Sequence, residues 1–463
     1  MWEALWTGQI AGSPYTDLYS SVWSLWATES WWGTWNNQWF NYPSGQPWSP
    51  STLFWGTVLI PLKQVFSIST LYNISLLSNR ILSCLAFYLA GRQWNQSHQC
   101  GLLWMIAISM TPMIHGFAVE GILEGTQLWP LGLWLWSIKK HWKASVFFGA
   151  LVLISNWYWA LCWGIIGLII GWKHRRIWLI QAGSVLVCLP WILHFLSFQK
   201  NGVSLDPSVY RAMGFQMGIP TPNLLSPPNP FAISNYLGWI FLGWAGWNYR
   251  KQWSRQSQWL IGLGLLISWG FPWMQNIPIV DSLRFPYRIH LLTLIGLCWV
   301  CRSLSLRYMR PLLYLMLLEN LCLSGIDWKI PSSSSKVPDY TTQVDGPVLE
   351  LPGPLSRKPG EFDPSRPRMK YLQYYQTQHQ QPSPWSLHFN GLIEGSSCFS
   401  ETRMIDPHAT DSEQRQISNP KCWDRVQWVV IHTANRDLDN TLQSLNFHLV
   451  QPYNEESPAL WRR

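Results

Sequence analysis

Apolar runs recur along residues 51–325, separated by short loops, and this pattern most constrains what the chain can fold into. Only 12% of the 463 residues are charged and 35 are tryptophan, a composition far from that of ordinary soluble proteins. Residues 326–463 carry Pro, Ser, Gln and charged residues and contain no run of bilayer length. The pattern predicts a mainly α polytopic membrane bundle followed by a small α/β domain.

Ten apolar runs are candidate transmembrane helices and predict a bundle of about ten spans. The stretch 144–172 is long for one helix and short for two, and lysines on both flanks favour two crossings with a turn near Asn156. If this stretch formed a single helix, every later loop would lie on the opposite side of the membrane. The ten runs lie near residues 72–91, 100–116, 127–138, 144–157, 158–172, 177–198, 236–249, 257–275, 289–304 and 311–325.

Charged loops predict the orientation, because cytoplasmic loops of membrane proteins are enriched in Lys and Arg. Alternate loops hold basic residues without Asp or Glu, whereas the first 62 residues contain no Lys or Arg. This places residues 1–50 and 326–463 outside a cytoplasmic (inner) membrane. Small basic clusters rather than one basic face argue against a nucleic-acid partner. The clusters are Arg92; Lys139, Lys140 and Lys143; Lys173, Arg175 and Arg176; Arg250, Lys251 and Arg255; and Arg302, Arg307 and Arg310.

The first 50 residues would cross the membrane without a basic signal segment or a preceding helix. We therefore expect the natural reading frame to begin upstream of Met1 and to supply one more transmembrane helix.

Several short motifs carry a family resemblance. They are "YPSG" at 42–45, "YNISLL" at 72–77, "EGILEGTQLWPLGLWLW" at 120–136, "DSLRFPYR" at 281–288, "GPVLELPGP" at 346–354, "MKYLQYYQTQH" at 369–379 and "WVVIHTANRD" at 428–437. Their order resembles the GT-C superfamily of integral membrane glycosyltransferases, and most closely an uncharacterised bacterial branch of it. The resemblance implies a sugar donor carried on polyprenyl phosphate. The absence of a first helix departs from the family pattern.

Asp17 lies in the large first external loop, where the resemblance implies a catalytic carboxylate. It would act as a general base on the acceptor hydroxyl, and partial desolvation by tryptophans would raise its pKa toward a useful range. The alternative is that Asp17, which follows Ser13-Pro14, caps a juxtamembrane helix.

Glu120 and Glu124 are candidates for substrate binding. Four residues apart, they would share one face of a helix, where two like charges favour a cation or a shared proton. They would orient the acceptor or hold a divalent cation, and the sequence identifies no cofactor beyond that cation. The alternative is a polar helix end in water, and Gly121 and Gly125 weaken the helix itself.

Arg284, Tyr287 and Arg288 belong to a stiff aromatic turn, "RFPYR", that is predicted to be external. The planar guanidinium matches a pair of phosphate oxygens, so the two arginines are candidates for binding the carrier phosphate. Contact with ordinary lipid headgroups, or pairing with Asp281, would explain the same residues.

Several other features allow both a structural and a functional interpretation. Arg80 and Glu319 fall inside predicted spans and would pair with each other, or Arg80 would help to hold the carrier phosphate. Cys298 and Cys301 favour packing over redox chemistry, whereas Cys398 and Cys422 would bridge in an oxidising compartment. Seven N-terminal tryptophans would anchor the chain at the membrane interface or stack on sugars: Trp23, Trp26, Trp31, Trp32, Trp35, Trp39 and Trp48.

Zinc-protease, P-loop and dinucleotide-binding motifs are absent from the sequence. Together with the resemblance, the sequence predicts transfer of a sugar from a polyprenyl-phosphate donor to a glycan, lipid or protein acceptor on the outer side of the membrane. A lipid-linked glycan transporter or flippase, and an inactive protein of the same fold, are the alternatives. No inverted repeat, which a transporter would show, is visible.

Overall fold

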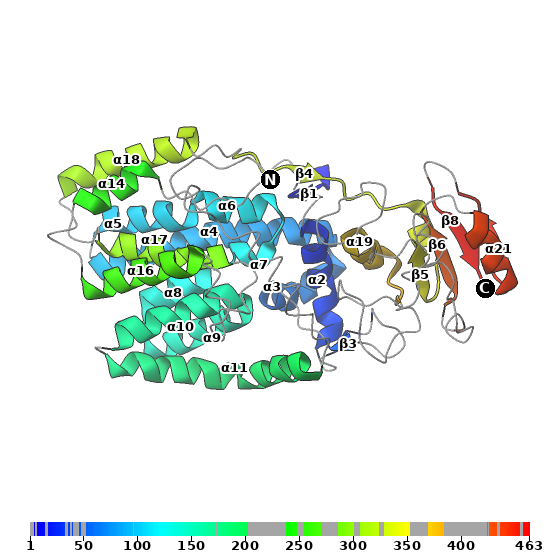
Figure 1. The fold of residues 1–463 in the computed structure, drawn as a ribbon, viewed down its shortest axis with the longest axis horizontal. Helices are drawn as coiled ribbons and strands as arrows, with labels where there is room; N and C mark the ends of the chain where they lie inside the picture. The colour runs from blue at the N-terminus through cyan, green and yellow to red at the C-terminus, as the bar shows by residue number, and fades with distance from the viewer. Residues whose placement is uncertain are drawn as a thin grey trace. The chain divides into compact units, whose positions relative to one another are not determined.

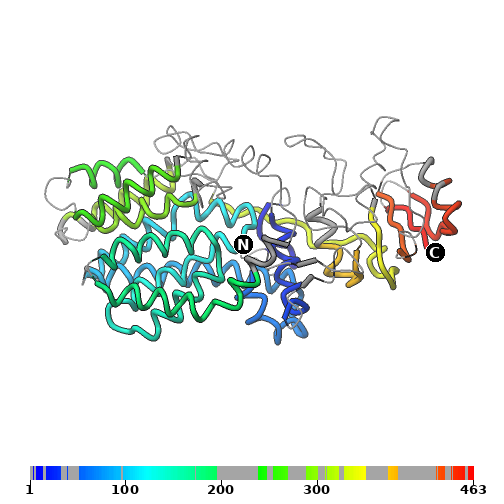
Figure 2. Tube along the Cα trace, turned by 60° about the horizontal axis from the view of Figure 1, so that its bottom comes forward, coloured from blue at the N-terminus to red at the C-terminus, as the bar shows by residue number. Residues whose placement is uncertain are grey.

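The structure is a computed structural model of the whole chain, and it forms two compact units. Unit 1 contains residues 1–16, 69–192 and 206–333, and unit 2 contains residues 17–68, 193–205 and 334–463 (Figures 1 and 2). The predicted external segment 1–50 is divided between them at Asp17. The residues that the structure describes are 4, 7–13, 17–32, 36–37, 39, 46–47, 52–95, 97–172, 174–201, 238–247, 254–269, 286–300, 306–323, 328–351, 369–383, 424, 426–432, 436–453 and 457–463.

Unit 1 is a helical bundle, and every predicted apolar run contains a helix. A two-residue antiparallel pair, β1 (Ile10–Ala11) with β4 (Ser332–Ser333), joins its ends. The first residue of α4 and the last turns of α11, residues 193–201, are counted with unit 2. The helices are α4 (Ile68–Asn95), α5 (His98–Trp104), η2 (Met105–Ser109), α6 (Pro112–Val119), α7 (Leu123–Thr126), α8 (Trp129–Ser137), α9 (Trp142–Ser155), α10 (Trp157–Gly171), α11 (Arg175–Asn201), α14 (Trp239–Trp247), α16 (Arg255–Trp269), η4 (Pro286–His290), α17 (Leu291–Val300) and α18 (Leu306–Leu323).

The prediction of a mainly helical fold is confirmed, but the bundle of ten spans is not. Within the described ranges, two helices are long and apolar enough to cross a membrane, at 68–94 in α4 and 175–194 in α11. A third candidate is the pair from α5 to α6, which bends by 46° where η2 forms a π-helical turn ahead of Pro112. Several other helices, such as α9 and α10, are apolar but shorter.

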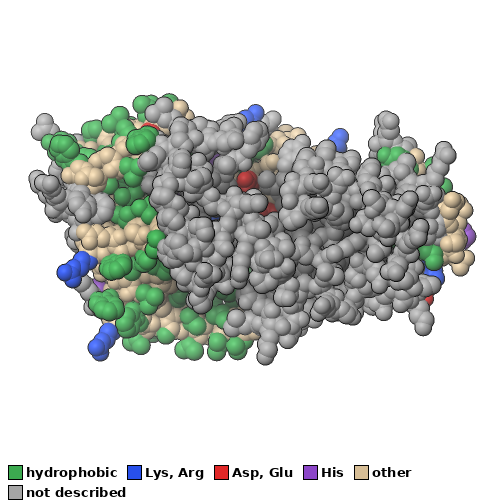
Figure 3. All heavy atoms as spheres, viewed as in Figure 1, with side chains coloured by type: hydrophobic (Ala, Val, Ile, Leu, Met, Phe, Trp, Pro, Cys, Tyr) green, Lys and Arg blue, Asp and Glu red, His purple; other side chains and the backbone are tan. Residues whose placement is uncertain are grey.

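Apolar side chains also lie on the outside of unit 1. On α11, Leu179 is 73% exposed and Leu186 is 67% exposed, and their spacing of seven residues puts both on one face. Figure 3 shows apolar side chains over much of the described surface of this unit. Exposed apolar faces of this kind suit contact with lipid better than contact with water.

The predicted turn near Asn156 is confirmed. Helix α9 ends at Ser155 and α10 begins at Trp157, with Asn156 in an extended conformation between them. The Asn156 side chain caps α10 by accepting a hydrogen bond of 2.8 Å from the backbone N–H of Tyr158. The two helices therefore fold back on each other as a hairpin.

Helices α4 and α8 run side by side in the same direction. Asn79 bonds Thr126 before α8, a Cβ on Gly132 would lie 2.8 Å from the Cβ of Ala86, and the indole of Trp94 donates to the carbonyl of Leu135 at 2.8 Å. Such close approach needs a residue without a side chain. The parallel course brings the loops after α4 and after α8 to the same end of the bundle.

Unit 2 combines helices with one four-stranded sheet. The strand order is β5-β6-β8-β7, in which β5 and β6 are parallel and the other neighbours are antiparallel. Strand β5 lies within the "GPVLELPGP" motif, and β6 opens the "WVVIHTANRD" motif. The elements are α2 (Leu18–Trp31), β2 (Asn36–Asn37), β3 (Gln46–Pro47), α3 (Leu53–Val58), η1 (Ile60–Gln64), η6 (Asp339–Thr342), β5 (Val348–Leu351), α19 (Met369–His379), β6 (Trp428–Ile431), α21 (Arg436–Ser444), β7 (His448–Gln451) and β8 (Ala459–Arg462).

The predicted pairing of Arg80 with Glu319 is wrong. The Glu319 carboxylate instead accepts hydrogen bonds from the backbone N–H groups of Trp239 and Ile240 at the start of α14. A carboxylate is stabilised there because the first N–H groups of a helix have no partner within the helix.

Candidate functional site

The candidate residues fall into different parts of the structure. Glu120, Glu124 and Arg288 belong to unit 1, and Asp17 belongs to unit 2. Tyr287 lies in η4 but its side chain is outside the described part of the chain, as is the whole of Arg284. The cysteine pair Cys398 and Cys422 and the partner of Cys298 in its C-x-x-C also lie outside; Cys298 itself is buried in α17.

Glu120 and Glu124 do not share one helix, which corrects the expectation of a common face. Helix α6 ends at Val119, Glu120 follows as its C-cap, and α7 begins at Leu123. Gly121 breaks the helix because its φ of +69° lies in the left-handed region that favours glycine. Within the described ranges, no group of three or more His, Cys, Asp or Glu side chains is arranged to hold a metal ion.

The short helix α7, which carries Glu124, is held in place by hydrogen bonds from α4. The fully buried Asn79 amide donates to the carbonyl of Leu123 at 3.2 Å and to the hydroxyl of Thr126 at 3.1 Å. The indole N–H of Trp129 donates to the Asn79 side-chain oxygen at 3.2 Å. Because a buried amide with all these bonds is costly to move, α7 presents Glu124 in a defined place.

Arg288 is the one described member of the predicted arginine pair, and it is buried, with 6% exposure. Its guanidinium carbon lies 5.0 Å from the ring centre of Phe117 and 4.8 Å from that of Tyr158. Two aromatic faces stabilise a buried cation through the negative charge of their π systems. A guanidinium also stays protonated at any physiological pH, so the positive charge is permanent.

Glu124 and Arg288 share an aromatic setting. The ring of Phe117 contacts Trp159, the indole of which donates to the backbone carbonyl of Glu124 at 3.3 Å. Phe117 and Tyr158, the neighbour of Trp159, are the two rings against Arg288. Two motifs far apart in the sequence thus meet at one aromatic cluster in unit 1.

The aromatic partners of this site were not among the residues predicted from sequence. Phe117 was hidden in an apolar run, and Tyr158 and Trp159 in the crowded "NWYW" stretch after Asn156. The one usable signal was position: this stretch directly follows the turn between α9 and α10, on the side of the membrane predicted for Glu120 and Glu124.

Asp17 immediately precedes α2 and is half-buried. It occupies the N-cap position, yet its side chain makes no capping hydrogen bond to the helix. The simple capping role is therefore not supported, and the catalytic role stays a prediction.

Two of the predicted tryptophans line a pocket in unit 2. The ring centres of Trp26 and Trp39 are 4.7 Å apart, and the indole of Trp39 donates to the Ser30 hydroxyl at 2.7 Å. The cavity is about 480 Å³, within the range of about 300–1,000 Å³ that is usual for small-molecule sites. The other lining residues are Glu29, Ser30, Lys63, Phe66, Ser67, Ile68, Thr377, Gln378 and Gln380.

The charged pair in this pocket is asymmetric. Lys63 is largely buried and Glu29 is largely exposed, and their charged atoms lie 3.5 Å apart. Burial lowers the pKa of Lys63, while the charge and hydrogen bond of Glu29 oppose that shift. Lys63 also donates to the backbone carbonyl of Trp26 at 2.9 Å, which holds α2 against η1. Aromatic rings beside amide, hydroxyl and charged groups are the mixture that suits a sugar.

A buried carboxylate lies elsewhere in unit 2, on strand β5. Glu350 accepts a hydrogen bond of 3.0 Å from the Tyr340 hydroxyl and one of 3.0 Å from His432, and His379 lies 3.7 Å away. Burial acts to raise the pKa of Glu350, but the hydrogen bonds and charges of the two histidines outweigh it and bring the pKa to about 2. Both carboxylate oxygens have donors, so this cluster is a structural element of the domain.

No protein-family model matches the chain, and no curated protein matches its sequence. The resemblance to membrane glycosyltransferases therefore depends on the motifs alone.

Proposed function

We propose that this protein is a polytopic membrane glycosyltransferase that moves a sugar from a polyprenyl-phosphate donor to an acceptor on the outer side of the membrane. In this proposal the ten apolar runs all enter the inner membrane, and the sheet of unit 2 lies outside it. Arg288, with Arg284 and Tyr287, binds the carrier phosphate; Glu124 and Glu120 assist; and Asp17 is the base that deprotonates the acceptor hydroxyl.

One observation carries most of the proposal: the buried guanidinium of Arg288 lies between Phe117 and Tyr158, close to the helix that carries Glu124. Arginine suits a phosphate because its planar N–H fork matches two phosphate oxygens. In a site of low dielectric such hydrogen bonds are stronger than in water. A carboxylate nearby would then contact the sugar hydroxyls or the leaving group.

The tryptophan pocket in unit 2 supplies a second argument. Trp26 and Trp39 offer ring faces for a sugar, and Ser30, Gln378 and Gln380 offer hydrogen-bonding groups. This supports the sugar-stacking interpretation for two of the seven tryptophans, as part of an acceptor site.

The test uses the purified full chain in lipid nanodiscs with a polyprenyl-phosphate sugar as the donor. Arg288→Gln should weaken donor binding about 10- to 100-fold, because it removes charge-assisted hydrogen bonds to phosphate. Asp17→Asn should abolish release of the sugar and leave donor binding intact. The control is Arg310→Gln, which removes an exposed arginine of α18 that is outside the site.

The rival functions give different outcomes. A flippase would carry the donor lipid across the membrane at the same rate with Asp17→Asn as without it. An inactive protein of this fold would bind donor but show no transfer in the unaltered chain. Equal donor binding by Arg288→Gln and the unaltered protein would rule out the phosphate site.

A further inference from the structure

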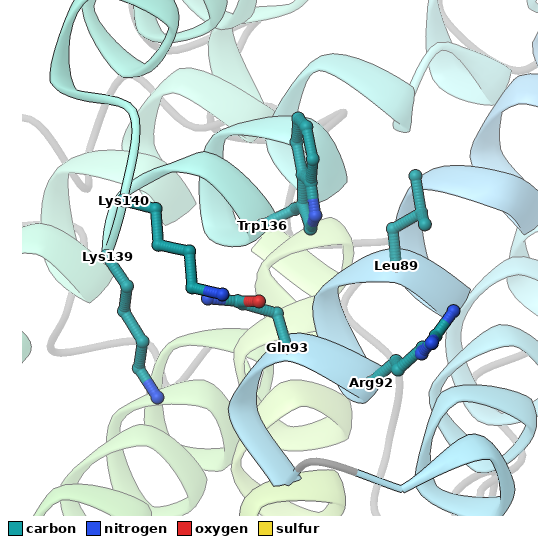
Figure 4. A pocket seen from close by; sticks show the side chains of 6 residues that line it. All are labelled: Leu89, Arg92, Gln93, Trp136, Lys139 and Lys140. Carbon is teal, nitrogen blue, oxygen red and sulfur yellow. The ribbon is translucent and has the colours of Figure 1, made fainter.

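Another cavity, of about 650 Å³, lies in unit 1 and opens at the ends of α4 and α8 (Figure 4). Its six lining residues come from the last turns of α4 and from α8 with the turn that follows it. They combine three cations, one amide, one indole and one aliphatic side chain: Leu89, Arg92, Gln93, Trp136, Lys139 and Lys140. In Figure 4 these side chains surround a common space.

The cavity carries a concentrated positive charge. Its three cations are exposed, whereas Leu89, Gln93 and Trp136 are half-buried, so the charges lie at the mouth and the uncharged groups lie deeper. No Asp or Glu occurs in residues 81–119 or 125–205. Among the described residues, Arg92 and Lys140 have no acidic side chain within ion-pair distance. The site is therefore set up for an anion.

The outward face of α4 leads into this cavity. Ile81 and Leu85 are 56% and 50% exposed, and Leu89 follows at the same spacing of four residues. Residues four apart lie along one face of a helix, so the three form an apolar stripe that ends at Arg92. Helix α4 is long and apolar enough to cross a membrane. With α4 across the membrane, the stripe would lie at acyl-chain depth and the cations at headgroup depth.

We propose that this cavity binds the phosphate headgroup of an anionic phospholipid, with an acyl chain along Ile81, Leu85 and Leu89. Arg92, Lys139 and Lys140 contact the phosphate, and the Trp136 indole lies at the interface where tryptophan side chains concentrate. A cation–π contact orients Lys139, because its ammonium nitrogen lies 3.8 Å from the ring centre of Trp94. This site is at the opposite end of the bundle from Glu124 and is independent of sugar transfer.

The experiment compares lipid retention by the full chain in nanodiscs of phosphatidylcholine alone and with added phosphatidylglycerol, measured by native mass spectrometry after detergent extraction. We expect phosphatidylglycerol to be retained preferentially. The double variant Arg92→Gln with Lys140→Gln should weaken that retention about fivefold for each charge removed. The matched control, Lys143→Gln with Arg175→Gln, removes two exposed charges from the loops predicted to lie on the same side, but outside the cavity.

Further arms separate lipid from soluble anion. Leu85→Asn should lower phosphatidylglycerol retention without changing any charge, and inorganic phosphate should fail to displace the lipid. Equal losses in the cavity variant and its control would show general surface attraction and overturn the proposal. Displacement by inorganic phosphate, or equal retention of phosphatidylcholine, would overturn it as well. Each variant is first checked for unchanged size-exclusion behaviour, and a cavity variant that fails this check is replaced by Lys140→Gln alone.

Discussion

Units 1 and 2 each bury a charged side chain, but they surround it differently. In unit 1 the Arg288 guanidinium is held by the ring faces of Phe117 and Tyr158. In unit 2 the Glu350 carboxylate is held by hydrogen bonds from Tyr340 and His432, with His379 nearby. The aromatic rings stabilise the charge of Arg288 without forming directional hydrogen bonds to its N–H groups. The carboxylate oxygens of Glu350, in contrast, already accept hydrogen bonds from neighbouring side chains. The first arrangement suits a ligand and the second suits the stability of the fold.

The largest expected effect breaks the second arrangement. Glu350→Ala should lower the free energy of unfolding of unit 2 by about 3 kcal/mol, because it leaves two histidines and a buried hydroxyl without their acceptor. Hydrogen exchange of the β5 and β6 amides in the full chain measures this. The control is Asp345→Asn, since Asp345 is 60% exposed. A loss below about 1 kcal/mol would mean that Glu350 is not structural.

Acid should weaken the same element. Because the pKa of Glu350 is lowered from 4.5 to about 2 in the folded protein, its contribution is fully present above pH 4.5 and is lost as the pH falls toward 2. The contribution amounts to about 3 kcal/mol. The difference in β5 and β6 protection between the unaltered protein and Glu350→Gln should shrink over that range. A constant difference from neutral pH down to 2 would contradict the assignment.

Close helix packing in unit 1 gives a smaller effect. Gly132→Ala should destabilise the bundle by about 2 kcal/mol, because the new Cβ would lie 2.8 Å from the Cβ of Ala86 and 3.0 Å from its backbone carbon. Gly164→Ala is the matched substitution within a helix, since a Cβ there would meet nothing within 4 Å. It should stabilise α10 by about 0.5–1 kcal/mol. Thermal unfolding in detergent distinguishes the two signs.

Arg288→Lys tests the phosphate site proposed in unit 1. Lysine keeps the charge beside Phe117 and Tyr158 but loses the planar fork, so donor binding should fall about tenfold while the stability of the bundle changes little. Isothermal titration with the donor lipid and thermal unfolding give the two readouts. A large loss of stability with unchanged binding would make Arg288 structural, like Glu350.

The smallest effect is expected on the surface of unit 2. Arg462 and Asp345 form an ion pair of 3.0 Å, with both side chains about half exposed. Arg462→Gln should cost less than about 1 kcal/mol, because water screens exposed pairs. Hydrogen exchange of β8 measures it, and a loss as large as that of Glu350→Ala would remove the distinction between buried and exposed charges.

The sequence predicted what depends on local pattern. Apolar runs located the helices, and the lysines on both flanks of 144–172 indicated a turn near Asn156. Sequence reasoning failed where distant segments meet. Glu319 does not pair with Arg80 but accepts hydrogen bonds from the start of α14. The contacts of Phe117 and Tyr158 with Arg288 were not predicted. The spacing of Glu120 and Glu124 had also predicted a common helix face, but the left-handed backbone at Gly121 interrupts the helix between them. Such contacts leave no periodic signal in the chain.

The strand order of unit 2 has a consequence for biosynthesis. β8 lies between β6 and β7 although it follows both in the sequence, so the ribosome delivers it last of the four strands. Until then β6 and β7 leave edges open to pairing with other nascent chains. Chaperone protection of this segment should be needed for longer than for the hairpin helices α9 and α10, whose partners emerge one after the other.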